Sequence, residues 1–151
     1  MKILFYLVCL IWLSFTASAQ SVFSNQTNAA LQKVIEDYRI TEKKYFSWER
    51  ELYTSSDFDK ARQKFGELYQ NLHNTIIKFE GEKPVILNGS YEAPTRARKQ
   101  NSINFQFLPA TGVVQKLKVE LVLRQLADNW AISLMVYEPA EADFKMMSAV
   151  Y

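Results

Sequence analysis

The sequence predicts an α+β fold in which an N-terminal αα hairpin packs on one face of a curved antiparallel sheet of about four strands. Two observations carry this prediction. Gly and Pro are absent from residues 20–65, where apolar side chains recur at helical spacing, whereas all four prolines lie after residue 83. From Pro84 onward the apolar period changes to two. Because helices come first and strands follow, the elements are segregated, which favours α+β over an alternating α/β arrangement.

The start of the chain has the pattern of an export signal. Residues 1–2 give a short basic start, residues 3–15 are apolar almost throughout, and residues 17–19 read Ala-Ser-Ala. The apolar run falls short of the ~20 residues that cross a bilayer. We therefore expect residues 1–19 to be a signal peptide cleaved between Ala19 and Gln20, and the mature chain to be periplasmic or secreted, without stable membrane insertion.

Composition and charge exclude several classes of protein. A hydrophobic fraction of 48% beside a charged fraction of 23% excludes a disordered chain. The net charge of +2 gives no electrostatic footprint for nucleic acid. The only cysteine, Cys9, lies in the predicted signal peptide, and His73 is the only histidine, so a metal site would depend mainly on carboxylates. We expect no metal, no cofactor and no nucleic-acid partner.

Two helices are expected before the first strand. The first helix is predicted from Asn28 to Tyr53, because apolar residues recur there every seven positions, at Leu31, Tyr38, Tyr45 and Leu52. The second begins near Asp57, where residues 54–57 offer N-cap side chains, and ends at Gly81. Its apolar stripe comprises Phe58, Ala61, Phe65, Leu68, Tyr69, Leu72, Ile76 and Phe79. We attribute Gly66, which interrupts this helix, to the close approach of a neighbouring backbone.

The second half of the chain predicts strands. Residues 85–87 form a short strand followed by an Asn88-Gly89 turn, and residues 103–107 alternate in the next. Residues 117–124 and 130–137 alternate most clearly and form a hairpin closed at residues 127–129. Residues 20–138 are thus expected to form one domain. Residues 139–151 form a C-terminal tail, for which a last helical turn around Phe144 and Met147 stays open.

The order of two helices, a strand and a meander, ending in a hairpin with Asp128-Asn129-Trp130 at its turn, resembles small secreted members of the nuclear-transport-factor-2-like (cystatin-like roll) superfamily. Such domains commonly carry an Asp-Gly-x-Trp-like turn, here with Asn for Gly and no spacer. The resemblance covers residues 28–138 by order of elements. It implies a cone-shaped sheet wrapped on helices, sometimes around a ligand cavity. It implies no activity, because the superfamily hosts isomerases, dehydratases, transport adaptors and domains without catalysis.

Two groups of residues are candidates for binding. The first is aromatic, with one histidine, and is expected between helices and sheet; it consists of Tyr38, Tyr45, Trp48, Tyr69, His73 and Trp130. Rings with a few polar groups are typical of a small-ligand pocket, although rings at this spacing equally fill an ordinary core. The second group is a basic loop for contact with an anion or a partner, comprising Arg96, Arg98 and Lys99. A solvated surface explains such a loop as well.

We expect a non-enzymatic binding domain for a small apolar ligand or a protein partner, because neither a Gly-x-Ser-x-Gly motif nor a phosphate-binding loop is present. Two alternatives remain open. One is an enzyme of isomerase or lyase type with His73 as base. The other is an accessory subunit of a cell-envelope complex that makes contact through Val122, Met135 and Tyr137. A hollow interior would favour ligand or enzyme, and a filled interior would favour a partner.

Overall fold

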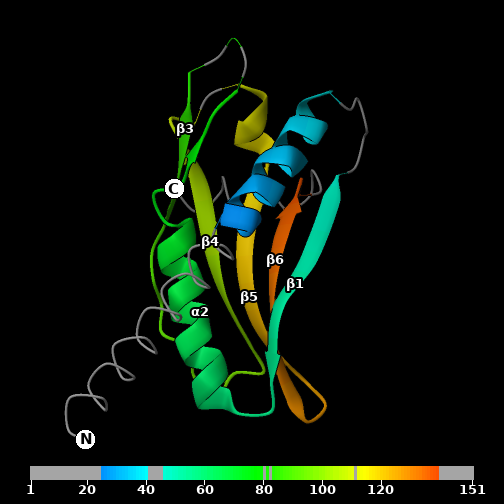
Figure 1. Cartoon of the computed structure of the whole chain (residues 1–151), viewed down its shortest axis with the longest axis vertical. Helices are drawn as coiled ribbons and strands as arrows, with labels where there is room; N and C mark the ends of the chain where they lie inside the picture. The colour runs from blue at the N-terminus through cyan, green and yellow to red at the C-terminus, as the bar shows by residue number, and fades with distance from the viewer. Residues whose placement is uncertain (1–24, 41–45, 80, 82, 111, 140–151) are drawn as a thin grey trace, which may run out of the picture.

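The computed structural model describes residues 25–40, 46–79, 81, 83–110 and 112–139, which Figure 1 draws in colour. The predicted signal peptide with its cleavage point, the side chain of Tyr45, and the C-terminal residues around Phe144 and Met147 lie outside this range. No helix within it is long and apolar enough to span a bilayer.

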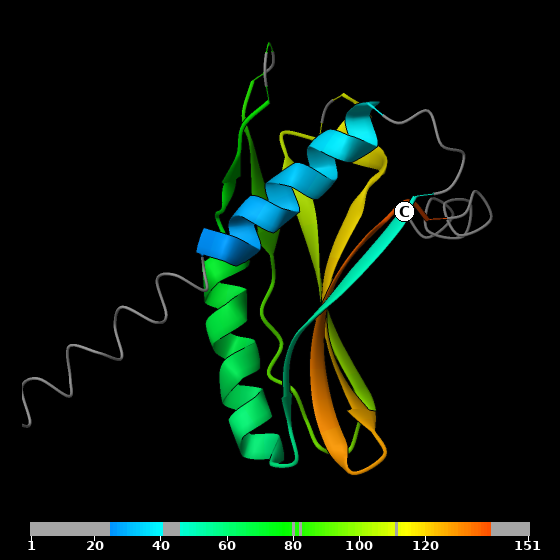
Figure 2. The same cartoon turned by 45° about the vertical axis from the view of Figure 1, so that its right-hand side comes forward.

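The architecture is α+β, with two helices and one curled, six-stranded antiparallel sheet. Residues 25–40 form the first helix. The remaining elements are β1 (Ser47–Ser55), α2 (Phe58–Leu72), β2 (Ile76–Ile77), β3 (Val85–Gly89), β4 (Gln100–Leu108), the 3₁₀ turn η1 (Val113–Lys116), β5 (Lys118–Leu126) and β6 (Asn129–Tyr137). The strand order is β1-β6-β5-β4-β3-β2. Figures 1 and 2 show both helices on the same face of the sheet.

The predicted N-terminal helical hairpin is wrong, because β1 stands between the two helices. Residues 47–53, which were expected to belong to the first helix, instead form most of β1, which pairs with β6. Trp48 and Tyr53 lie opposite Val136 and Ile132 on the inner face of the sheet. The register shifts between Glu51 and Tyr53, and this irregularity places two inner residues five positions apart, which hides the two-residue period of a strand.

The start of α2 is confirmed and its end is corrected. The Asp57 carboxylate accepts hydrogen bonds from the backbone N–H groups of Asp59 and Lys60, at 2.8 and 3.4 Å. The helix stops at Leu72 and does not reach Gly81. Asn74 has a positive φ of 65°, and its N–H donates to the carbonyl of Leu87 in β3. The chain then joins the sheet as β2, so the apolar spacing that suggested further helical turns belongs to a strand.

The three long strands β4, β5 and β6 are confirmed, but Asn88-Gly89 is not a turn. Gly89 is the last residue of β3, in register with Phe105. A Cβ at this position would come within 2.9 Å of the Phe105 ring, so close packing explains the glycine. At Gly66 the neighbour is also a side chain and not a backbone, since a Cβ there would lie 3.4 Å from the hydroxyl of Tyr91.

One hydrophobic core joins both helices to the inner face of the sheet. Its fully buried members include Leu31, Ile35, Phe65, Leu68, Leu72, Leu87, Leu121, Leu123, Ile132 and Leu134. Val122 points to the opposite face, yet only 1% of it is exposed, and it lies in register with Ser102 and Ser133. The expected contact patch is therefore wrong at Val122. The hydroxyl of Tyr137 donates to Glu120 on the same face.

Candidate functional site

The described aromatic residues that were predicted to share a pocket pack against different neighbours. The ring of Tyr38 packs edge-on against Phe46, with centroids 5.0 Å apart, and its hydroxyl donates to Glu138. Trp48 is half-buried on β1, the edge strand next to β6. Trp130 lies at the start of β6. Tyr38 and Trp130 thus contact different rings, Phe46 and Phe58.

Tyr69 and His73 form a pair at the C-terminal end of α2. Their rings stack with centroids 5.2 Å apart. The hydroxyl of Tyr69 donates to the carbonyl of Gly89, and the Nδ1 atom of His73 accepts from the backbone N–H of the same residue at 3.5 Å. Both side chains thus fix α2 to β3. In the described part of the chain no three His, Cys, Asp or Glu residues come together as a metal site.

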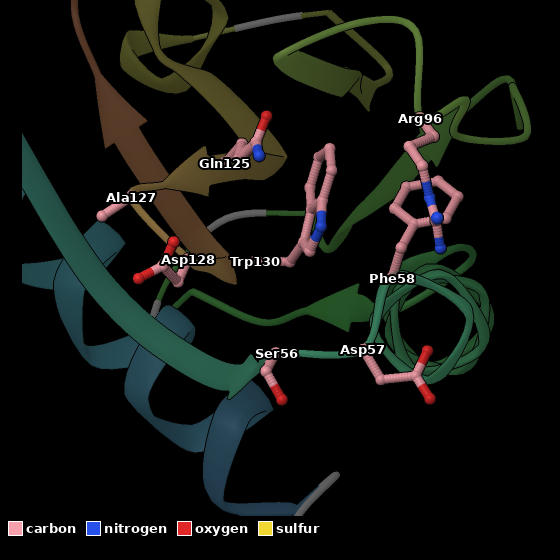
Figure 3. Close-up of a pocket in the computed structure, with 8 residues that line it drawn as sticks. All are labelled: Ser56, Asp57, Phe58, Arg96, Gln125, Ala127, Asp128 and Trp130. Carbon is pink, nitrogen blue, oxygen red and sulfur yellow. The ribbon is translucent and has the colours of Figure 1, made fainter.

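A surface hollow of about 560 Å³ lies where the β1–α2 connection meets the β5–β6 turn (Figure 3). It is lined by Ser56, Asp57, Phe58, Arg96, Gln125, Ala127, Asp128 and Trp130. It therefore brings together one residue of the predicted aromatic group, Trp130, and one residue of the predicted basic loop, Arg96. This convergence makes the hollow the candidate functional site.

The aromatic side of the hollow is a stack of three side chains. The rings of Phe58 and Trp130 meet edge-on with centroids 4.7 Å apart, and both are about 5% exposed. The guanidinium of Arg96 lies over the Phe58 ring, 5.3 Å from its centroid. The indole N–H of Trp130 has no acceptor among the described residues. The hollow thus offers two hydrogen-bond donors beside two rings that are almost fully buried.

The loop that carries Arg96 is held by a buried amide. Asn101 is only 6% exposed; its Oδ1 accepts from the Thr95 N–H, and its Nδ2 donates to the carbonyls of Thr95 and Arg98. The N–H of Gln125 in β5 donates to the carbonyl of Lys99, which ties the same loop to the sheet. Arg96 consequently sits on a loop whose backbone is fixed at both ends.

The other two basic residues of the loop lie outside the hollow. Arg98 forms an ion pair with Glu92 at 2.6 Å. Lys99 contributes its carbonyl to the contact with β5 and does not line the hollow. Arg96 differs from Arg98 because no acidic side chain in the described residues pairs with it. Of the three predicted contact residues, Arg96 alone is both unpaired and next to an apolar wall.

Asp57, Phe58, Gln125 and Asp128 were not predicted as site residues. Asp57 could be identified only as a helix cap, and Asp128 only as a turn residue. Ala127, with a positive φ of 48°, completes the tight β5–β6 turn that brings Asp128 to the hollow. The sequence contains no local signal that the start of α2 and the β5–β6 turn lie next to each other, because these two segments are far apart in the chain.

A second hollow of about 660 Å³ lies on the outer face of the sheet and includes Arg124, Met135 and Tyr137. Its guanidinium is already engaged, since Arg124 pairs with Glu49 at 2.5 Å and also contacts the sulfur of Met135. The Nε atom of Arg124 is buried without a hydrogen-bond partner among the described residues, so this guanidinium is only partly satisfied. Comparisons with protein-family models, with curated proteins and with solved structures gave no match for the chain.

Proposed function

We propose that this chain is an exported, non-enzymatic binding domain whose ligand is a protein partner, and that the hollow around Arg96 and Trp130 is its contact site. The observation that carries the proposal is the unpaired guanidinium of Arg96, held over Phe58 at the rim of a surface hollow. Arginine and tryptophan in such surroundings are the residues that most often dominate protein–protein contacts.

The packing of the predicted pocket residues supports a partner over a small apolar ligand. Tyr38 and Tyr69 are each at most 7% exposed and each packs against another ring. Their side chains occupy core space that a ligand would need. The proposal keeps the resemblance to nuclear-transport-factor-2-like domains, whose implied architecture of helices on a curled sheet agrees with the α+β fold.

The contacts of His73 support a structural role and not that of a catalytic base. Its Nδ1 atom faces the Gly89 N–H, and its ring stacks on Tyr69. We expect the His73→Gln protein to be folded, abundant and able to complement a strain that lacks the wild-type protein, because glutamine can also accept the Gly89 hydrogen bond. Failure of a folded and abundant His73→Gln protein to complement would favour the isomerase or lyase alternative.

Site-specific photo-crosslinking in intact cells tests the contact site. A benzophenone side chain at Gln125, which lines the hollow, is expected to give a discrete protein adduct. The same group at Gln63, an exposed residue of α2 that does not line the hollow, is the position control. The adduct should disappear in Arg96→Glu and persist in Arg62→Glu, since Arg62 lies over the same Phe58 ring but pairs with Asp59.

Two outcomes would reject the proposed function. Equal adducts from Gln125 and Gln63 would indicate random encounter and no contact site. Saturable, stoichiometric binding of a neutral apolar fluorophore such as N-phenylnaphthylamine, without any adduct at Gln125, would favour the small-ligand alternative.

A further inference from the structure

We infer that the hollow binds a carboxylate group that the protein partner presents, with Arg96 as the charged donor and the indole N–H of Trp130 as a second donor. This inference rests on the proposed function and specifies the chemistry of its site. Carboxylate oxygens accept hydrogen bonds from guanidinium groups with favourable geometry, and such charge-assisted hydrogen bonds are stronger than neutral ones.

The arginines around Phe58 show why Arg96 is the donor. Two guanidiniums lie over this ring, those of Arg62 at 6.0 Å and Arg96 at 5.3 Å from its centroid. Arg62 is paired with Asp59 at 3.3 Å and does not line the hollow. Arg96 lines the hollow and has no acidic partner in the described residues. Arg96 is therefore the cation whose charge remains available to a ligand.

The protein fixes Arg96 before any ligand arrives. The buried Asn101 amide bonds to the loop backbone on both sides of Arg96, and the ring of Phe58 supports the guanidinium. Because the loop backbone is already held, binding costs less conformational entropy than it would with an arginine on a free loop. A single carboxylate group can therefore bind weakly at this site, and further contacts with the partner add to the affinity.

Of the two acidic residues that line the hollow, only one should repel a bound carboxylate strongly. The Oδ1 atom of Asp57 accepts two N–H groups at the start of α2, so the helix terminus compensates its charge. Figure 3 shows Arg96 and Phe58 on one side of the Trp130 ring and Asp128 on the other. Asp128 is thus the remaining opposing charge, and its removal should strengthen binding.

An acidic protein segment fits this charge arrangement better than an anionic membrane. Attraction to a membrane surface takes a cluster of several uncompensated Lys or Arg residues. Here Asp57 and Asp128 line the same hollow as Arg96, and Arg98 is paired with Glu92. One available guanidinium beside an apolar wall suits a single carboxylate with an adjoining apolar group.

NMR titration of the full-length protein tests the inference, with the Trp130 indole N–H as reporter, assigned from its loss in Trp130→Phe. The probes are acetyl-Ala-Glu-Ala-amide, which carries a side-chain carboxylate, and acetyl-Ala-Ala with a free C-terminal carboxylate. Acetyl-Ala-Gln-Ala-amide is the neutral control. We expect a saturable shift with at least one acidic peptide, with a dissociation constant on the order of 1 mM, and no saturable shift with the neutral one.

Three variants test whether each charged side chain strengthens or weakens carboxylate binding. Arg96→Gln should weaken binding about tenfold or more, as expected for the loss of a charge-assisted pair. Asp128→Asn should tighten binding about twofold to fivefold, by removing repulsion at partly screened distance. Arg62→Gln should leave the dissociation constant unchanged, because Arg62 is outside the hollow. The preferred acidic peptide tells whether a side chain or a chain terminus is bound.

Equal binding of the neutral peptide, unchanged binding in Arg96→Gln, or no saturable shift with either acidic peptide would overturn the inference. Stronger shifts with inorganic phosphate or with anionic phospholipid vesicles would overturn it in favour of a phosphate or headgroup site. An adduct at Gln125 that persists without carboxylate binding would leave the proposed function standing and remove this inference. Absence of the Gln125 adduct in the otherwise wild-type protein would instead reject the proposed function.

Discussion

The hydroxyl of Tyr69 donates a 2.9 Å hydrogen bond to the carbonyl oxygen of Gly89, and so connects the last turn of α2 to the end of β3. The N–H of Gly89 faces His73 one helical turn further on. The backbone N–H and C=O of Gly89 therefore bond to side chains of the C-terminal cap and the last turn of α2. This arrangement fixes how the helix lies on the outer strands of the sheet.

Replacement of Tyr69 by phenylalanine should destabilise the protein by about 1 to 3 kcal/mol, because the buried carbonyl of Gly89 would lose its partner without regaining water. Urea denaturation measures the difference. Tyr91→Phe is the control, since Tyr91 packs against the same Tyr69 ring but is 45% exposed. Equal midpoints for wild type and Tyr69→Phe would show that the hydrogen bond contributes nothing.

Two glycine-to-alanine changes should have opposite effects. In Gly89→Ala the new Cβ would lie 2.9 Å from the buried Phe105 ring and 3.0 Å from the Asn104 carbonyl, so we expect a loss of about 1 to 3 kcal/mol. In Gly66→Ala the nearest atom is the Tyr91 hydroxyl at 3.4 Å, on a side chain that can move. Gly66→Ala should therefore gain about 0.5 to 1 kcal/mol of helix stability. Thermal unfolding of both variants checks the two signs, and a shift in the same direction would contradict this assignment.

The strands that could be predicted are those whose partners lie nearby in the chain. β5 and β6 alternate without interruption and meet through a tight turn, so pattern and turn agree. β1 could not be predicted, because its partner β6 is far away in sequence and a register shift breaks its period at Glu51. β2 has two residues, which is too short for any period.

The candidate site shows the same limit. Trp130 could be selected as a member of an aromatic group, and Arg96 as a member of a basic loop with Arg98 and Lys99. Their meeting with Asp57 and Phe58 depends on how α2 starts beside the β5–β6 turn, which is a property of the whole sheet.

Three substitutions along β5 should differ in their effect on stability, because one lies on the inner face, one on the outer face and one at the exposed end of the strand. Leu121→Ala, on the inner face with no exposed surface, should cost about 2 to 5 kcal/mol. Val122→Ala, on the opposite face but 1% exposed, should cost about 1 to 2 kcal/mol, since fewer methyl groups are lost. Leu126→Ala, which is 48% exposed, is the control and should change stability by less than about 0.5 kcal/mol. Chemical denaturation gives all three values, and a neutral Val122→Ala would mean that the outer face is solvated there.

The contact between Tyr38 and Glu138 should make stability depend on pH in the alkaline range. Burial, followed by the charge of Glu138 and its hydrogen bond with the phenol, raises the pKa of Tyr38 above its ordinary value of 10.0. Folding thus favours the protonated phenol. The resulting stabilisation is fully present below the unfolded pKa and is lost as pH rises through the folded pKa.

Urea midpoints of wild type and Tyr38→Phe, measured from about pH 8 to about pH 11, test this dependence. The wild type should be more stable below the ordinary tyrosine pKa, because it keeps the hydrogen bond to Glu138, and the difference should shrink above it. The other tyrosines titrate in both proteins, so the difference isolates Tyr38. Glu138→Gln should flatten the wild-type slope by removing the charge that opposes ionisation. Parallel curves for wild type and Tyr38→Phe would show that the phenol ionises as easily in the folded protein as in the unfolded chain.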